Sequence, residues 1–183
     1  MNSIQRFILI SQAFIILAFG MLSPIYAIYV EEVGGGILVT TGSTAAFMMA
    51  TGILVFILGR WEDHQKHLKK LIILGYFFSA LGFLGYIFVT NVYHLFIVQA
   101  LLGISIAVRS PALSALYSKK MEKGKRVSVW SEWEAMWYIV TAAASISGGL
   151  VVKYFGFHTL LTIMFISSVC ALIASLSMPE KAL

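Results

Sequence analysis

The sequence has 183 residues, of which 60% are hydrophobic and only 11% are charged. Soluble domains carry about 25% charged residues, and the mean hydropathy of +0.90 lies far above their range. The composition therefore excludes an ordinary soluble enzyme or binding domain. The net charge of +5 does not indicate nucleic-acid binding, because no nucleic-acid-binding motif accompanies it.

Long apolar segments determine the fold class. A helix needs about 20 mostly apolar residues to cross a hydrocarbon core about 30 Å thick. Six such segments use most of the chain, so we predict an all-α integral membrane protein that forms one six-helix domain over residues 1–183. The first segment is too long for a signal peptide and lacks a cleavage site, so we interpret it as a retained helix. The six predicted helices cover residues 7–30, 37–58, 71–89, 93–117, 127–152 and 157–178.

Basic residues gather in two of the predicted loops, after the second helix and after the fourth. The opposite side has Lys153, and its first loop carries Glu31 and Glu32. Loops rich in Lys and Arg stay in the cytoplasm, so we predict a multi-pass protein of the cytoplasmic membrane with both termini inside. The basic residues of the two loops are Arg60, Lys66, Lys69, Lys70, Lys119, Lys120, Lys123, Lys125 and Arg126.

The layout of these loops divides the chain into two halves of three helices. Each half places its long basic loop after a different helix, a pattern that favours two three-helix units of inverted topology. Small residues at helical spacing predict close packing of the third and fifth helices against neighbours. These residues are Gly75, Ser79 and Gly82 in the third helix, and Ala143, Ser147, Gly148 and Gly149 in the fifth.

The most specific motif lies at the end of the second predicted helix. Gly59 is followed four residues later by Asp63, and then by a basic turn with Lys66 and Lys69. An acid in such a loop can bind a helix N-terminus or a cation and so hold one conformation. The stretch resembles the signature loop of the major facilitator superfamily, Gly-x-x-x-Asp-Arg-x-Gly-Arg-Lys. The resemblance implies a gating loop made of these four residues, whereas a basic loop that only sets topology would leave the Gly-to-Asp spacing unexplained.

Other stretches resemble the same superfamily. The outer end of the first helix reads Leu-Ser-Pro-Ile-Tyr over residues 22–26, and the fourth helix contains Gln99 and Gly103, which is close to an Arg-x-x-x-Gly element with Gln99 in place of the arginine. Gly148 and Gly149 are similar to the glycine pair that ends the fifth helix of exporters. The resemblance covers the whole chain and implies one six-helix half of a twelve-helix transporter, nearest to an exporter-like branch.

Three charged residues fall inside predicted helices: Arg109, Glu132 and Glu134. Such a charge costs several kcal/mol unless it is paired or hydrated. Arg109 and the glutamates lie at comparable depths, so an ion pair is feasible, although the two carboxylates point in nearly opposite directions along their helix. Snorkelling of the glutamates to the membrane interface is an equally open interpretation.

Further candidates for a solute or ion pathway are polar and aromatic. Gln12 and Tyr26 recur with Phe19 at seven-residue spacing in the first helix, and Trp137 follows Trp130 and Trp133 in the fifth. Packing explains the first-helix stripe as well as solute contact does, and an interfacial aromatic belt is the better interpretation of Trp130 and Trp133. The predicted pathway residues are Gln12, Tyr26, Gln99, Arg109, Glu132, Glu134 and Trp137.

We therefore expect a secondary active transporter that moves a small solute by alternating access, with a proton or another ion as coupling ion, and that pairs as a homodimer in the lipid bilayer. The alternative is a non-transporting membrane scaffold or partner subunit. An enzyme is not expected, because no nucleophile–base set, phosphate-binding loop or dinucleotide motif is present and the four histidines lack metal-ligand spacing. Accordingly we expect no cofactor, no metal site and no nucleic-acid partner.

Overall fold

The computed structural model describes residues 3–62, 68–119 and 126–178 of the chain. Over these residues the backbone is helical, with no strand, so the all-α prediction is confirmed. The elements are α1 (Ser3–Leu22), the 3-10 turn η1 (Ser23–Ile25), α2 (Tyr26–Glu32), α3 (Ile37–Glu62), α4 (Leu68–Ile87), α5 (Val92–Lys119) and α6 (Arg126–Leu176).

Pro24 divides the first predicted helix. Apolar composition predicts one helix over residues 7–30, but α1 ends at Leu22 and the chain continues through η1 into α2. A proline has no N–H to donate, and its ring clashes with the carbonyl four residues earlier, so an unbroken helix is unfavourable there. The apolar stretch Gln5–Glu32 remains long enough to cross a membrane.

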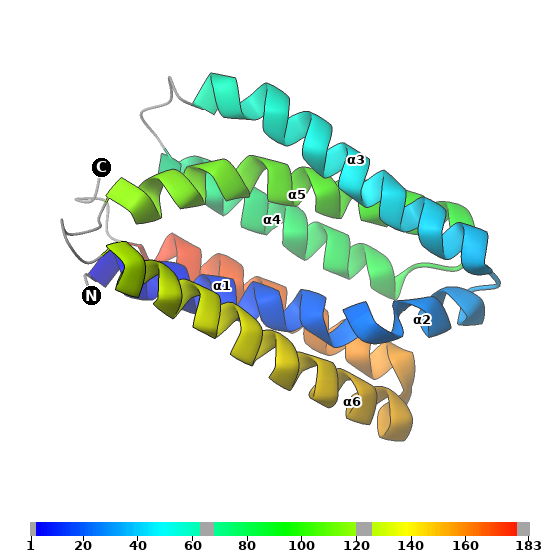
Figure 1. Ribbon diagram of the computed structural model, residues 1–183. Coiled ribbons are helices and arrows are strands. Elements are labelled where there is room, and N and C mark those ends of the chain that lie inside the picture. The colour runs from blue at the N-terminus through cyan, green and yellow to red at the C-terminus, as the bar shows by residue number, and fades with distance from the viewer. Residues whose placement is uncertain (1–2, 63–67, 120–125, 179–183) are drawn as a thin grey trace.

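Gly156 divides α6 into two helices. Its φ of 79° and ψ of 173° are not helical, and glycine adopts such a conformation without the clash that a Cβ would cause. Figure 1 shows the ribbon turning back on itself at this point of α6. The described residues thus contain five apolar helices long enough to span a membrane, or six when α6 is divided at Gly156, as the sequence analysis predicted for its fifth and sixth segments.

The helices pack as an elongated bundle in which α1 lies on α6, α4 on α5, and α3 along α5 (Figure 1). Helix α4 also packs against α6. The described N- and C-terminal segments lie at the same end of the bundle (Figure 1). Helix α3 is the least enclosed, because only 6% of its most apolar stretch is buried. Figure 1 shows α3 along one flank of the bundle and the first part of α6 along the opposite flank.

Glycines bring two pairs of helices into close contact. A Cβ on Gly75 would overlap Arg109 of α5, and a Cβ on Gly82 would lie 2.5 Å from the Leu102 side chain. Between them the hydroxyls of Ser79 and Ser105 are 2.9 Å apart. The predicted small face of the third segment is thus confirmed. On α6, Gly148 meets the backbone of α1 at Met21, whereas Gly149 has open space around it.

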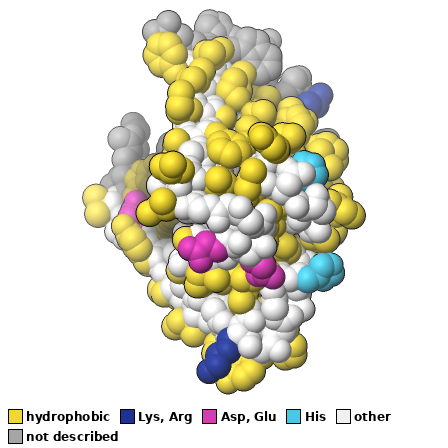
Figure 2. Space-filling model, turned by 90° about the vertical axis from the view of Figure 1, so that its right-hand side faces the viewer, with side chains coloured by type: hydrophobic (Ala, Val, Ile, Leu, Met, Phe, Trp, Pro, Cys, Tyr) yellow, Lys and Arg dark blue, Asp and Glu magenta, His cyan; other side chains and the backbone are white. Residues whose placement is uncertain are grey.

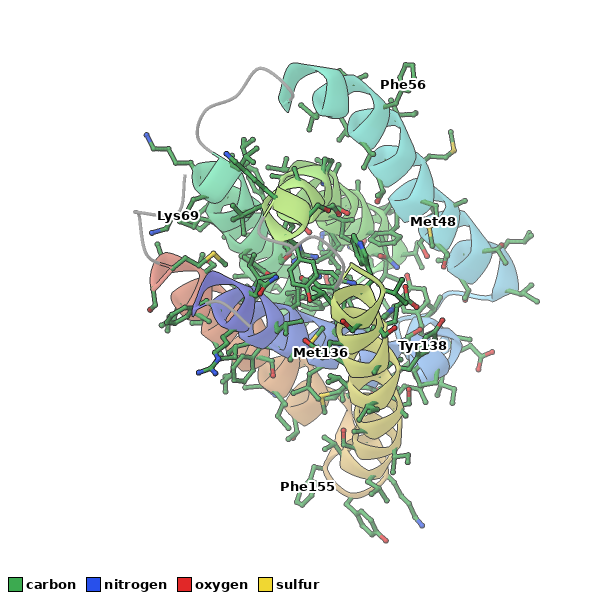
Figure 3. The ribbon with its side chains drawn as sticks, turned by 60° about the vertical axis from the view of Figure 1, so that its left-hand side comes forward. Met48, Phe56, Lys69, Met136, Tyr138 and Phe155 are labelled. Atoms are coloured by element: carbon green, nitrogen blue, oxygen red, sulfur yellow. The ribbon has the colours of Figure 1, made fainter. Side chains whose placement is uncertain are left out.

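The outer surface is largely apolar. Phe56 on α3 is 66% exposed and Phe155 on α6 is 71% exposed, and Figure 3 shows both side chains pointing away from the other helices. Figure 2 shows hydrophobic side chains over much of the face at the α2 end, with acidic side chains near its centre. Helix α2 carries the exposed residues Glu31 and Glu32. Exposed apolar side chains along the helices, such as Phe56 and Phe155, suit contact with lipid rather than water.

Candidate functional site

A cavity of about 460 Å³ lies between α1, α3, α5 and α6. It runs beside the part of α5 that follows Arg109 and the part of α6 that follows Trp133. Its lining combines one cationic side chain, several hydroxyls and several aromatic rings. The lining residues are Gln12, Ile15, Ile16, Phe19, Gly20, Ser23, Phe47, Ile106, Arg109, Ser110, Leu113, Ser114, Trp133, Trp137 and Thr141.

A smaller cavity of about 230 Å³ lies nearer the α2 end, between Tyr26, Thr44, Tyr86 and Gln99. Both cavities share Phe19, Ser23 and Phe47 in their walls. We call Phe19 and Phe47 the aromatic partition, because their rings lie 6.2 Å apart where the two cavities meet. The Phe19 ring also meets the Phe83 ring edge-on at 4.9 Å, which holds it in place.

Arg109 is the polar centre of the larger cavity. Its side chain is 5% exposed, and its guanidinium lies over the Tyr76 ring, 4.7 Å from the centroid. The Tyr76 hydroxyl shares its one hydrogen between Ser11 Oγ at 3.1 Å and Gln12 Oε1 at 3.0 Å. A cation over an aromatic face gains about 0.5–2 kcal/mol, which offsets only part of the cost of burying a charge. The helix pair α4–α5 therefore holds a cation that its own neighbours do not fully satisfy.

Two buried side-chain atoms in the described part of the chain have no hydrogen-bond partner: Arg109 Nη1 and Thr141 Oγ1. Arg109 comes from α5 and Thr141 from α6, yet both line the larger cavity. Buried polar atoms in folded proteins are almost all hydrogen-bonded, so each exception needs a reason. Here the two exceptions converge on one space, which marks that space as the candidate functional site.

Comparison with known proteins decides the family. The sequence profile described as "Major Facilitator Superfamily" matches residues 8–182. The chain belongs to the major facilitator superfamily. The resemblance inferred from the Gly59–Asp63 loop is thereby confirmed. A protein of Bacillus subtilis (strain 168) named "Uncharacterized MFS-type transporter YqjV" is 28% identical over 149 residues, which are 81% of this chain and 35% of that protein. The chain thus matches about a third of the length of this relative.

In this superfamily member the predicted pathway residues lie in three places: the larger cavity, the smaller cavity and the exposed surface. Gln12, Arg109 and Trp137 line the larger cavity, and Tyr26 and Gln99 line the smaller one. Tyr26 also ties α2 to α3, because its hydroxyl lies 2.7 Å from Ser43 Oγ. The sequence therefore brings polar residues from distant segments to two adjoining cavities.

The two glutamates lie elsewhere. Glu132 and Glu134 are exposed, and Glu134 borders a shallow surface depression beside Trp130. Within the described residues neither forms an ion pair with Arg109, whose guanidinium faces Tyr76 instead. The ion pair considered in the sequence analysis is therefore not formed in this structure. Because both glutamates are exposed, snorkelling to the membrane interface stays the open interpretation.

The predicted gating loop is described only at its two ends. Gly59 lies near the end of α3, and a Cβ there would meet nothing within 4 Å. Lys69 lies in the first turn of α4 (Figure 3) and donates from Nζ to the backbone oxygen of Met178, beyond the end of α6. Asp63 and Lys66 lie outside the described residues.

Three residues of the site had little or no signal in the sequence analysis. Tyr76 and Thr141 sit in apolar helices without a motif, and Trp133 was assigned to an aromatic belt. In the structure Trp133 packs on Tyr117 at 4.9 Å and also lines the larger cavity. The spacing of Trp133, Trp137 and Thr141, four residues apart, is the signal that could have placed these three residues on one face of α6. No such signal existed for Tyr76, which lies on α4.

Proposed function

We propose that this chain is a half-size unit of a secondary active transporter, which moves a small solute across the cytoplasmic membrane by alternating access. The observation that carries the proposal is the larger cavity, whose mainly apolar lining includes the buried Arg109 and four hydroxyl side chains, Ser23, Ser110, Ser114 and Thr141. Its volume of about 460 Å³ lies within the range of about 300–1,000 Å³ typical of small-molecule sites. A scaffold has no need for a charged residue at this depth.

The proposal includes the topology. It assigns six membrane-spanning helices, the last two being the parts of α6 on either side of Gly156, and places both termini in the cytoplasm. The larger cavity then lies toward the cytoplasm and the smaller cavity toward the outside. The aromatic partition of Phe19 and Phe47 lies between them, which is where a closed transporter needs a barrier. Two three-helix units of inverted topology fit the same layout.

We further propose that two copies pack as a homodimer, with the two-fold axis along the membrane normal. The larger cavity lies between the flanks formed by α3 and the first part of α6, and a facing unit is needed to close a watery space there. Both flanks carry exposed apolar side chains, such as Ile53 of α3 and Ile146 of α6. One sequence can supply both halves, because both copies share the same orientation. An ion gradient, of protons or another ion, is the proposed energy source.

Accessibility of single cysteines tests alternating access. Ser110→Cys reports on the larger cavity and Thr44→Cys on the smaller one, each in a Cys170→Ser background. We expect a charged maleimide to reach Ser110→Cys from the cytoplasmic side and Thr44→Cys from the outside. An imposed pH or ion gradient should raise one labelling rate while it lowers the other. Labelling rates that stay fixed under every gradient would favour the scaffold.

Cross-linking in bilayers tests the dimer separately. A cysteine at Ile53 on α3 faces the expected partner, whereas one at Ile166 on the second part of α6 serves as an exposed control. We expect a cross-linked homodimer from Ile53→Cys and none from Ile166→Cys. A chain that remains monomeric while its cavities alternate would contradict the dimer and leave the transport proposal standing.

A further inference from the structure

We infer that the larger cavity binds a small organic anion with a flat apolar body, and that Arg109 holds its acidic group. The inference names the solute class of the transporter proposed above and rests on that proposal for its role in transport. That an anion binds in the cavity follows from the cavity itself and does not depend on transport. Four observations support it: the sign of the charge, the free hydrogen-bond donors, the aromatic walls and the way Tyr76 positions the guanidinium.

The charge of the cavity is positive and uncompensated. Arg109 is the charged residue among those that line it, and the other polar lining residues are Gln, Ser and Thr. Within the described residues no carboxylate pairs with Arg109. A guanidinium stays charged in proteins and presents a planar set of donors that matches carboxylate, sulfonate and phosphate groups. An acidic ligand would therefore supply the negative charge that no described side chain provides beside Arg109.

Two residues that line the cavity have polar side-chain atoms without a hydrogen-bond partner. Arg109 Nη1 on α5 and Thr141 Oγ1 on α6 are both buried beneath its wall. Ser110 and Ser114 follow Arg109 along α5, on the same cavity wall. An acidic group has several acceptor lone pairs, so it can accept from Arg109 and from a hydroxyl at the same time. A neutral acceptor could hydrogen-bond to the guanidinium but would leave its charge uncompensated, and a cationic solute would be repelled by it.

The walls around this polar end are aromatic. Trp133, Trp137 and Thr141 are spaced four residues apart and line the cavity from one face of α6. The aromatic partition of Phe19 and Phe47 closes the far end. Aromatic side chains pack well against flat apolar rings. The cavity thus offers a cationic end for the acidic group and an aromatic box for the rest of the molecule.

Tyr76 acts as a positioning residue for Arg109. Its ring covers one face of the guanidinium at 4.7 Å, and its hydroxyl is fixed by Ser11 and Gln12 of α1. The contact leaves Nη1 unbonded. If the role of Arg109 were purely structural, its loss would lower the stability of the bundle and would not change which ligands bind. The two roles therefore differ in a measurable way.

A matched pair of probes tests the inference: naphthalene-2-sulfonate, a permanent anion, and naphthalene-2-sulfonamide, a neutral molecule of nearly the same shape. Binding of each is measured by calorimetry to the full chain in nanodiscs of a lipid without net charge, with empty nanodiscs subtracted. We expect the sulfonate to bind at least about tenfold more tightly, as charge-assisted hydrogen bonds predict. Equal affinity, tighter binding of the sulfonamide, or no binding of either probe at millimolar concentration would overturn the inference.

Three variants test whether the preference for the sulfonate over the sulfonamide depends on residues of the larger cavity. Arg109→Gln should abolish it, Arg109→Lys should retain part of it, and Thr141→Val should weaken sulfonate binding a few-fold without a change in side-chain size. Lys153→Gln is the matched control, because Lys153 also lies near an aromatic ring, Tyr154 at 5.3 Å, but outside the cavity. A preference that survives in Arg109→Gln, with its helical circular dichroism intact, would contradict the assignment.

The outcome is separable from that of the transport proposal. If the sulfonate preference depends on Arg109 but the cysteines show no alternation, the anion site stands and transport fails. If the cysteines alternate while the probes bind equally, transport stands and the solute class assigned here is wrong.

Discussion

The guanidinium of Arg109 on α5 lies 4.7 Å from the centre of the Tyr76 ring on α4. The tyrosine hydroxyl is bound in turn by two side chains of α1. Three helices far apart in the sequence therefore meet at one buried cation. Because this cation lines the larger cavity, the packing of the bundle and the chemistry of the cavity depend on the same contacts.

The hydroxyl and the ring of Tyr76 contribute separately. Tyr76→Phe removes the hydrogen bonds to Ser11 and Gln12 and should destabilise the protein by about 1 kcal/mol, while it keeps the ring over Arg109. Tyr76→Leu removes the cation–π contact as well and should cost about 1–2 kcal/mol more. Thermal unfolding in detergent measures both. Equal effects of the two variants would show that the ring does not hold the guanidinium.

Gly75 permits the close contact between α4 and α5. In Gly75→Ala the new Cβ would overlap Arg109 and approach the Ser105 carbonyl to 2.8 Å, so we expect a loss of about 1–3 kcal/mol. Gly149→Ala is the control, because a Cβ there meets nothing within 4 Å. Alanine favours a helix over glycine by about 1 kcal/mol, so the control should be neutral or stabilising. A neutral Gly75→Ala would contradict the described packing.

The side chain of Phe19 separates the two cavities. Phe19→Ala should join them, because its ring contributes to both walls and packs on Phe47 and Phe83. We expect the single cysteines at Ser110 and Thr44 to become reachable from both sides of the membrane in this variant. Phe155→Ala, at a side chain that is 71% exposed, should leave their accessibility unchanged. Retention of one-sided labelling in Phe19→Ala would place the barrier elsewhere.

Asp63 lies outside the described residues, so its prediction comes from the sequence motif alone. Asp63→Asn removes the charge of the proposed gating loop and should slow the exchange of cavity accessibility at least about tenfold, without loss of membrane insertion. Asp63→Glu keeps the charge and should retain part of the rate. The reciprocal labelling of Ser110→Cys and Thr44→Cys measures both. Wild-type rates in Asp63→Asn would leave the loop as a topology signal.

The helices were predictable because the length of each apolar segment indicates whether it can span a membrane. The sequence also signals their breaks, at Pro24 by the missing N–H and at Gly156 by the freedom of its φ. The prediction still ran one helix through Pro24, because apolar composition continues on both sides of it. Composition reports burial in lipid and does not report a local change in helical hydrogen bonding.

The candidate site was predictable in part. A buried arginine stands out in any apolar helix, so Arg109 was found, and the polar positions Gln12 and Gln99 were found for the same reason. The partner of Arg109 was not predicted, because equal depth along two helices says nothing about their rotation. Glu132 and Glu134 share that depth, but both are exposed, whereas Tyr76 faces Arg109 because Gly75 allows α4 so close.

Uptake of radiolabelled naphthalene-2-sulfonate into proteoliposomes tests the central claim most directly, that the cavity around Arg109 is a transport pathway. The permanent negative charge keeps passive entry slow, so protein-dependent flux is measurable against empty liposomes. The account predicts saturable uptake by the wild-type chain, loss of uptake in Arg109→Gln, and wild-type uptake in Lys153→Gln. Uptake by the folded wild-type chain that is no faster than into empty liposomes, while the sulfonate still binds, would contradict it.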